Sequence, residues 1–155
     1  MSVSNRLKRQ EIWDLEASLG FLQNRLARKM KRALDSRVLE FGLTATQYIV
    51  LASLWEEDGI SFTELGERLY LDSPTLTGIA DRMERDGLLQ RQRDGDDRRV
   101  VKVHLTAKGR NLRPQIGEVA EEIDAQAWRG FTIAQKRQLT ESLQKIWENM
   151  NGKGD

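Results

Sequence analysis

The hydrophobic pattern of the chain changes at Gly87, and this change constrains the fold more than any other feature of the sequence. Before Gly87, apolar residues recur every three or four positions, which predicts amphipathic helices. From 88 to 105 they alternate with polar residues, and the polar run 94–99 interrupts the alternation, which predicts a β-hairpin with a charged tip. Helical spacing returns after 105. The sequence therefore predicts a mainly α fold with one small β-hairpin.

Capping residues divide the helical part into separate segments. Ser73 is expected to cap a helix whose first position is Pro74, where the missing N–H of proline costs nothing. Pro114 is expected to bend a later helix without ending it. Three further starts have the spacing of a capping box, namely Thr44 with Gln47, Ser61 with Glu64, and Thr132 with Gln135. The expected helices span 7–41, 44–55, 61–69, 73–85, 106–128 and 132–150.

Composition indicates one folded domain, because 39% of the 155 residues are hydrophobic and 32% are charged. The net charge of +1 says little about partners. Residues 44–105 carry 8 basic and 12 acidic side chains. Nucleic-acid binding by this segment would therefore depend on where individual arginines and lysines lie, not on bulk charge.

Residue content excludes several kinds of site. The chain has no cysteine, so disulfides, iron–sulfur clusters, zinc-thiolate sites and thiol catalysis are ruled out, and with His104 as its one histidine we expect no metal and no cofactor. His104 itself is expected on an exposed strand face without a special role. We expect no enzyme activity, since Glu56, Glu57 and Asp58 are consecutive rather than convergent and no glycine-rich phosphate loop is present. No apolar run approaches membrane length, and residues 1–10 lack a signal-peptide core, which favours a cytoplasmic location.

Three short helices followed at once by a hairpin form a winged helix-turn-helix. In such a unit, the helix that starts at Ser73 can enter the major groove of DNA, while the hairpin tip lies along the backbone or in the minor groove. The outward residues of this helix suit that task, because they comprise small hydroxyls, a glycine that permits close approach and one long donor. They are Ser73, Thr75, Thr77, Gly78 and Arg82.

The segment from Leu43 to Gly109 resembles the MarR family of bacterial transcription regulators. The helices outside it match in pattern, with one long helix before and two after, as in the dimerisation region of that family. The motifs that carry the resemblance, specific in this order and spacing, are LTATQY at 43–48, LGERL at 65–69, TLTGIADRME at 75–84, GLL at 87–89, DRR at 97–99 and LTAKG at 105–109.

This resemblance implies a homodimer that binds palindromic operator DNA and, as in many members, releases it when a small aromatic or phenolic ligand binds. It also implies that Asp97 pairs with a wing arginine and orients it, while Arg98 reaches the minor groove. The chain departs from the peroxide-sensing branch of the family, because it has no cysteine.

The residues expected to contact DNA lie on the helix that starts at Ser73 and on the hairpin. Two parts of this set have a plainer interpretation. Arg82 could pair with Asp81 or Asp86 on the surface instead, and the aspartate-rich tip could simply be solvated. The full set is Ser73, Pro74, Thr75, Thr77, Gly78, Arg82, Arg93, Asp97, Arg98 and Arg99.

The segments on either side of this unit are expected to form a homodimer, since they carry more apolar surface than the winged unit can cover. The expected organisation is an N-terminal dimerisation helix (1–43), a DNA-binding region (44–105) and C-terminal dimerisation helices (106–155), intertwined as one domain. The expected intersubunit core consists of Ile12, Trp13, Leu15, Leu139, Leu143, Ile146 and Trp147.

An effector pocket is expected where the first, second and fifth helices meet the winged unit. Aromatic side chains would form its walls, and a basic side chain on the first helix would hold a ligand carboxylate. Two plainer interpretations stay open, because the aromatic residues could fill the core and the basic stretch 25–32 could be a solvated face. The candidates are Trp13, Arg25, Arg28, Phe41, Tyr48 and Trp55.

The expected function is that of a homodimeric, sequence-specific DNA-binding regulator, a repressor released from a palindromic operator by a small aromatic or phenolic ligand. A constitutive architectural winged-helix protein without an effector is the alternative. A helical adaptor whose hairpin binds protein is a third hypothesis, which a gel-shift assay would separate from the first two.

Overall fold

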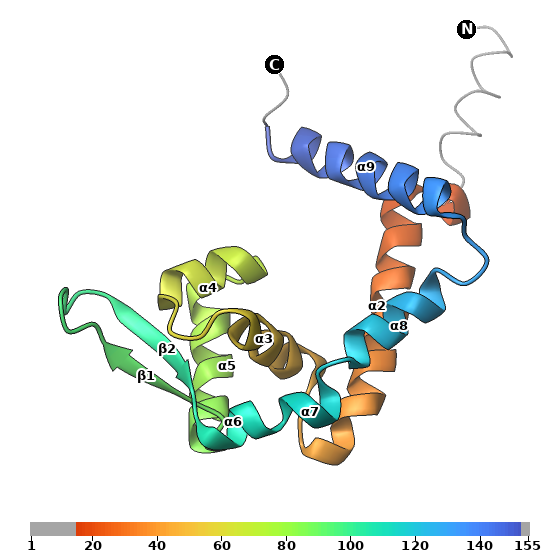
Figure 1. The fold of residues 1–155 in the computed structure, drawn as a ribbon. Helices are drawn as coiled ribbons and strands as arrows, with labels where there is room; N and C mark the ends of the chain where they lie inside the picture. The colour runs from red at the N-terminus through yellow and green to blue at the C-terminus, as the bar shows by residue number, and fades with distance from the viewer. Residues whose placement is uncertain (1–14, 153–155) are drawn as a thin grey trace, which may run out of the picture. The chain divides into compact units, whose positions relative to one another are not determined.

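The computed structural model describes residues 15–152, which are mostly helical with one two-stranded antiparallel sheet (Figure 1). The predicted fold class is confirmed. The chain divides into two compact units between Val119 and Ala120. In chain order the elements are η1 (Leu15–Ala17), α2 (Leu19–Val38), η2 (Leu39–Phe41), α3 (Ala45–Glu56), α4 (Phe62–Leu69), α5 (Ser73–Arg85), β1 (Leu89–Arg93), β2 (Val101–Leu105), α6 (Ala107–Asn111), α7 (Arg113–Ile116), α8 (Val119–Ala127) and α9 (Ile133–Met150).

The first long helix is shorter than the sequence predicts. Ser18 caps α2 because its hydroxyl accepts the N–H of Phe21, and the chain before it forms the 3₁₀ turn η1. The part of the expected helix from 7 to 14 lies outside the described residues. At the other end, a second 3₁₀ turn, η2, closes on Gly42 with a φ of 71°, the left-handed conformation that glycine adopts readily at the end of a helix.

The helix-turn-helix core holds together through fully buried side chains of each element. Leu54 on α3, Leu65 on α4 and Met83 on α5 are all buried with Leu89 and Val103 of the hairpin. Both strands of the hairpin therefore place one face against the helices. This burial fixes the position of α5, since three other elements cover its apolar face.

The β-hairpin has the two strands that the sequence predicts, and we call residues 89–105 the wing. Leu89 pairs with Leu105, Arg91 with Val103, and Arg93 with Val101. Because side chains alternate between the two faces of a strand, these three pairs share one face.

The sequence predicts one continuous helix from 106 to 128, and this prediction is wrong. The chain forms three separate helices there, α6, α7 and α8. Pro114 lies at the start of α7, where a residue without an N–H is tolerated, so it separates α6 from α7 instead of bending one helix. A Cβ on Gly117 would lie 2.6 Å from the carbonyl oxygen of Arg113, which shows how tightly the chain turns before α8.

Among residues 15–152, no single helix is long and apolar enough to cross a membrane. Two consecutive helical segments reach the necessary length and apolar composition only when they are taken together, and they are bent by 80° at the break between them; they are Leu19–Phe41 and Ala45–Glu56. The described residues contain no group of three or more His, Cys, Asp or Glu side chains placed to hold a metal ion.

Candidate nucleic-acid interface

Helix α5, which is by its position the recognition helix of the winged helix-turn-helix, is capped one residue earlier than expected. Asp72, not Ser73, is the N-cap: its carboxylate accepts the Thr75 N–H at 2.8 Å and the Thr75 hydroxyl at 2.7 Å. An aspartate at this position also faces the positive end of the helix dipole, which favours it over the neighbouring serine. The bond from the Thr75 N–H holds the pKa of Asp72 below its usual range. The Thr75 hydroxyl donates to Asp72 and so keeps only its capacity to accept a hydrogen bond from another group.

The outward face of α5 carries the residues expected there. Ser73, Pro74, Thr75 and Arg82 are exposed, and Thr77 and Gly78 are half-buried. The Arg82 guanidinium lies over Gly78, since a Cβ built on this glycine would come within 3.7 Å of its Nη1 atom. A methyl group at 78 would therefore meet Arg82 at an ordinary van der Waals distance.

Arg82 does not form the surface ion pair considered for it. Asp81 binds Arg91, and Asp86 lies 3.7 Å from Arg85. Among the residues that the structure describes, no acidic side chain pairs with Arg82. Its charge is available to a phosphate or a base.

At the tip of the wing, two aspartates pair with basic side chains of the wing itself. Asp97 accepts hydrogen bonds from the Nε and Nη2 atoms of Arg99, at 3.1 and 3.0 Å, and also from the backbone N–H of Arg99. The side-chain bond from Arg99 lowers the pKa of Asp97. Asp94 forms an ion pair with Lys102 at 2.7 Å. Two of the three tip aspartates are thus neutralised, which reduces their repulsion toward DNA.

Arg93 and Arg98 are exposed, and within 15–152 neither pairs with an acidic side chain. The aspartate pairing implied by the family resemblance therefore involves Arg99 and leaves Arg98 free. DNA contact by these residues stays a prediction. His104 is half-buried, with its ring beside Gly59, so it is less exposed than expected.

Sequence reasoning missed Arg91 as part of this region. Its guanidinium binds Glu84 and Asp81 on α5. The signal was present in the alternation of the strand, because Arg91 shares a face with Leu89, and a charge on an inward face needs a partner.

The aromatic candidates for an effector pocket are partly committed to packing. Tyr48 is 1% exposed, and its hydroxyl donates to the carbonyl of Gly117 at 3.0 Å. Trp55 donates its indole N–H to the carbonyl of Gly109. The rings of Tyr48 and Trp55 meet edge to face, with their centroids 5.9 Å apart. Phe41 is half-buried. Arg25 lies over the ring of Phe21, Arg28 is exposed, and Trp13 lies outside the described residues.

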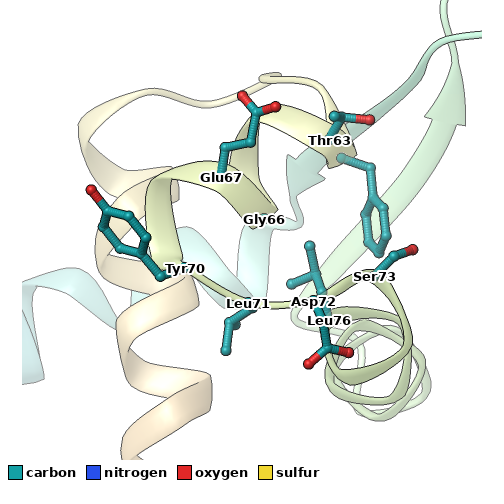
Figure 2. A pocket seen from close by; sticks show the side chains of 9 residues that line it. Thr63, Gly66, Glu67, Tyr70, Leu71, Asp72, Ser73 and Leu76 are labelled. Carbon is teal, nitrogen blue, oxygen red and sulfur yellow. The ribbon is translucent and has the colours of Figure 1, made fainter. Parts of the chain in front are cut away.

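A cavity of about 510 Å³ lies elsewhere, between α4 and the start of α5. Figure 2 shows side chains of α4 such as Thr63 and Glu67 on one side of it and Ser73 and Leu76 of α5 on the other. Ser73 is the one residue that this cavity shares with the predicted site residues. None of the expected effector-binding residues that the structure describes lines it.

The terminal helices of the two units expose apolar side chains at helical spacing. On α2 and the turn before it these include Leu15, Leu19 and Leu22, and on α9 they include Leu139, Leu143 and Trp147. None of the 18 residues of α9 is buried. Ile146 is half-buried, and Ile12 and Trp13 lie outside the described residues.

Comparison with known proteins relates this geometry to one family. Residues 43–101 match the model of the MarR family. The HTH-type transcriptional regulator TtmR of Methylorubrum extorquens is 34% identical over 152 residues, which cover 98% of this chain and 77% of that protein.

Two solved structures show what similar proteins bind. A MarR family regulator from Listeria monocytogenes, complexed with a 26mer DNA, is 27% identical with a TM-score of 0.79, covering 86% of this chain and 89% of that chain. The PcaV regulator from Streptomyces coelicolor, in complex with its natural ligand, is 26% identical with a TM-score of 0.77, covering 87% of this chain and 95% of that chain.

Proposed function

This chain belongs to the MarR family of transcriptional regulators, with its DNA-binding winged helix, and on that premise we propose that it is a homodimeric, sequence-specific repressor. A small aromatic or phenolic ligand releases it from a palindromic operator. We further propose that residues 44–105 bind the DNA, while 1–43 and 106–155 form the dimer.

The observation that carries the DNA-binding proposal is the distribution of arginines in the winged unit. Arg82, Arg93 and Arg98 have no acidic partner among residues 15–152, and they lie on α5 and the wing. These free charges stand out against a segment with four more acidic than basic residues. With the small polar residues at the start of α5, they form the proposed contact surface of Ser73, Pro74, Thr75, Thr77, Gly78, Arg82, Arg93, Asp97, Arg98 and Arg99.

Selection of bound duplexes from a random-sequence library tests this proposal. We expect the protein to enrich an inverted repeat, because a two-fold symmetric dimer presents α5 twice, about 34 Å apart. Substitution of Thr77, a base-reading candidate, should change the enriched sequence. Enrichment of no sequence, or of a single unrepeated site, would contradict the proposal.

The exposed apolar residues of α2 and α9 support the homodimer. A helix with no buried residue and a continuous apolar side needs a partner surface, and large apolar interfaces are typical of obligate dimers. A second copy of this chain supplies that surface in our proposal, with Leu15, Leu139, Leu143, Ile146 and Trp147 in the interface.

The repressor proposal includes an effector site near Phe41, Tyr48 and Trp55, with Arg25 or Arg28 holding a carboxylate. PcaV in complex with its natural ligand supports a small-molecule site for this chain as well. A ligand changes DNA affinity only by the difference in its affinity for two dimer shapes. The site must therefore favour one spacing of the two recognition helices over the other.

Salicylate provides a direct probe of this site. At 100 times its Kd, a ligand that binds the folded state should raise Tm by about 5–10 °C in a protein of this size. Cyclohexanecarboxylate is the matched control, since it has the carboxylate without the aromatic ring. If no member of a panel of aromatic acids raised Tm or changed DNA affinity, the constitutive architectural protein would be the better hypothesis.

Two further parts of the proposal follow from the regulator function. The protein is not an enzyme, because DNA binding and ligand response need no covalent chemistry. It acts in the cytoplasm, where bacterial operator DNA lies.

A further inference from the structure

Arg91 lies in the middle of β1, on the face of the hairpin that packs against the helices. Its partner across the strands is the buried Val103. The Arg91 side chain is 24% exposed, compared with 91% for Arg99 at the tip. A guanidinium in this position has lost much of its water and depends on protein partners.

Those partners come from two other elements. The Nε and Nη2 atoms of Arg91 donate to one carboxylate oxygen of Glu84 at 3.2 and 2.8 Å, and Nη2 also donates to Asp81. The backbone N–H of Arg91 donates to the other oxygen of Glu84 at 2.8 Å. The guanidinium carbon lies 5.8 Å from the centroid of the Phe62 ring on α4.

These contacts join the wing to the recognition helix. Within the described part of the chain, no other ion pair connects β1 or β2 with α5. The bond from the Arg91 N–H lowers the pKa of Glu84, and the bond to Glu84 raises the pKa of Arg91, so each group favours the charged form of the other.

The two carboxylates also lie where charge matters for DNA. Asp81 directly precedes Arg82 on α5 and Glu84 follows it two positions later, in a segment that is net acidic. Without a cation beside them, they would repel the phosphates that Arg82 and the wing arginines attract.

We propose that Arg91 is a positioning residue for DNA binding: it fixes the wing on the recognition helix and neutralises Asp81 and Glu84, without contacting DNA itself. This inference rests on the proposed DNA-binding function. It differs from a direct phosphate contact by Arg91 in two measurable ways, the salt dependence of binding and the effect of removing its partner.

The test uses the full-length protein and the duplex that the wild type enriches from a random library. The variants are Arg91→Gln, Glu84→Gln and the two combined. Glu84→Gln removes the charge but keeps an amide oxygen that accepts the Arg91 N–H, which makes it the milder structural change. Circular dichroism and thermal melting establish that each variant is folded at the assay temperature.

We expect Arg91→Gln to raise Kd roughly tenfold, an effect as large as the loss of one base contact although Arg91 makes none, and to leave the slope of log K against log salt unchanged. As a single substitution, Glu84→Gln should weaken DNA binding about threefold, because it weakens the ion pair between Glu84 and Arg91 of the wing. In the Arg91→Gln background the same change should tighten binding, since it removes an unpaired carboxylate from α5.

Arg68→Gln is the matched control. Arg68 is also an arginine held between two carboxylates, those of Glu57 and Glu64 at 2.7 and 3.1 Å, but neither of these partners lies on α5 or the wing. We expect its Kd to stay within about twofold of wild type, allowing for the loss of one positive charge.

Three results would overturn the proposal. Arg91→Gln could bind as Arg68→Gln does, it could lower the salt slope by about one, as loss of a phosphate contact does, or Glu84→Gln could tighten binding in the wild type. A wild-type protein that enriches no duplex would refute the proposed function instead, and the two failures are therefore distinct.

Discussion

Replacing Arg98 and Arg99 together by alanine should weaken binding to the selected duplex by about a hundredfold and lower the salt slope by about two. Each phosphate neutralised by an arginine releases counterions, so each lost contact removes about 0.9 from the slope. Fluorescence anisotropy at several salt concentrations measures both quantities. The control is Arg129→Ala with Arg137→Ala, which removes two positive charges outside the winged unit.

The two single variants should differ in DNA affinity, because Arg99 forms an ion pair with Asp97 and Arg98 does not. Arg98 is free, so Arg98→Ala should remove one contact and about one unit of slope. Arg99→Ala also leaves Asp97 without its partner near the DNA backbone, so its loss of affinity should be larger. Binding of the double variant at wild-type affinity would show that the wing does not contact DNA.

Replacing Leu143 and Trp147 by glutamate should convert the dimer to a monomer and weaken DNA binding by at least about a hundredfold. These side chains are 46% and 48% exposed in one chain, so the substitutions cost the folded monomer little, whereas they place two charges in the proposed interface. A monomer engages one half-site at a time and loses the effective concentration that links the two binding events.

Light scattering at micromolar concentration measures the mass of each variant. Gln138→Glu with Lys145→Gln is the control, because it makes the same change in net charge on the opposite side of α9. The control should remain a dimer with wild-type affinity for DNA. A wild-type protein with the mass of one chain would refute the homodimer, and so would a glutamate variant that stays dimeric while correctly folded.

Local signals predicted most of the fold correctly. The capping boxes predicted at Thr44 and Thr132 are both present with reciprocal hydrogen bonds. These features depend on residues three or four positions apart, so the sequence contains all of the information. The alternation of the hairpin strands is equally local, and its register follows from which face is buried.

The errors arose where two local signals compete or where tertiary contacts decide. Asp72 and Ser73 are both good N-caps, and the aspartate prevails because it reaches two groups of Thr75. After Pro114 the apolar period continues, but the tight turn at Gly117 separates α7 from α8. Periodicity alone does not show such a break.

The residues of the candidate site also divide into those that local sequence signals predict and those that depend on tertiary contacts. Small outward residues on α5 are a property of one helix, so they were predictable. The role of Arg91 depends on a strand meeting a helix, with Glu84 seven residues away in sequence, and only the folded structure brings these side chains together. The Tyr48 hydroxyl is another example, because its partner, the Gly117 carbonyl, is 69 residues distant.

In the proposed complex, two copies of α5 lie in successive major grooves on one face of the duplex. Insertion of five base pairs between the half-sites of the selected duplex turns one of them by about half a helical turn to the opposite face. We predict that Kd for wild-type protein rises about a hundredfold, as only one half-site can then be engaged. An unchanged Kd for the duplex with the insertion would contradict the proposal that a symmetric dimer reads both half-sites.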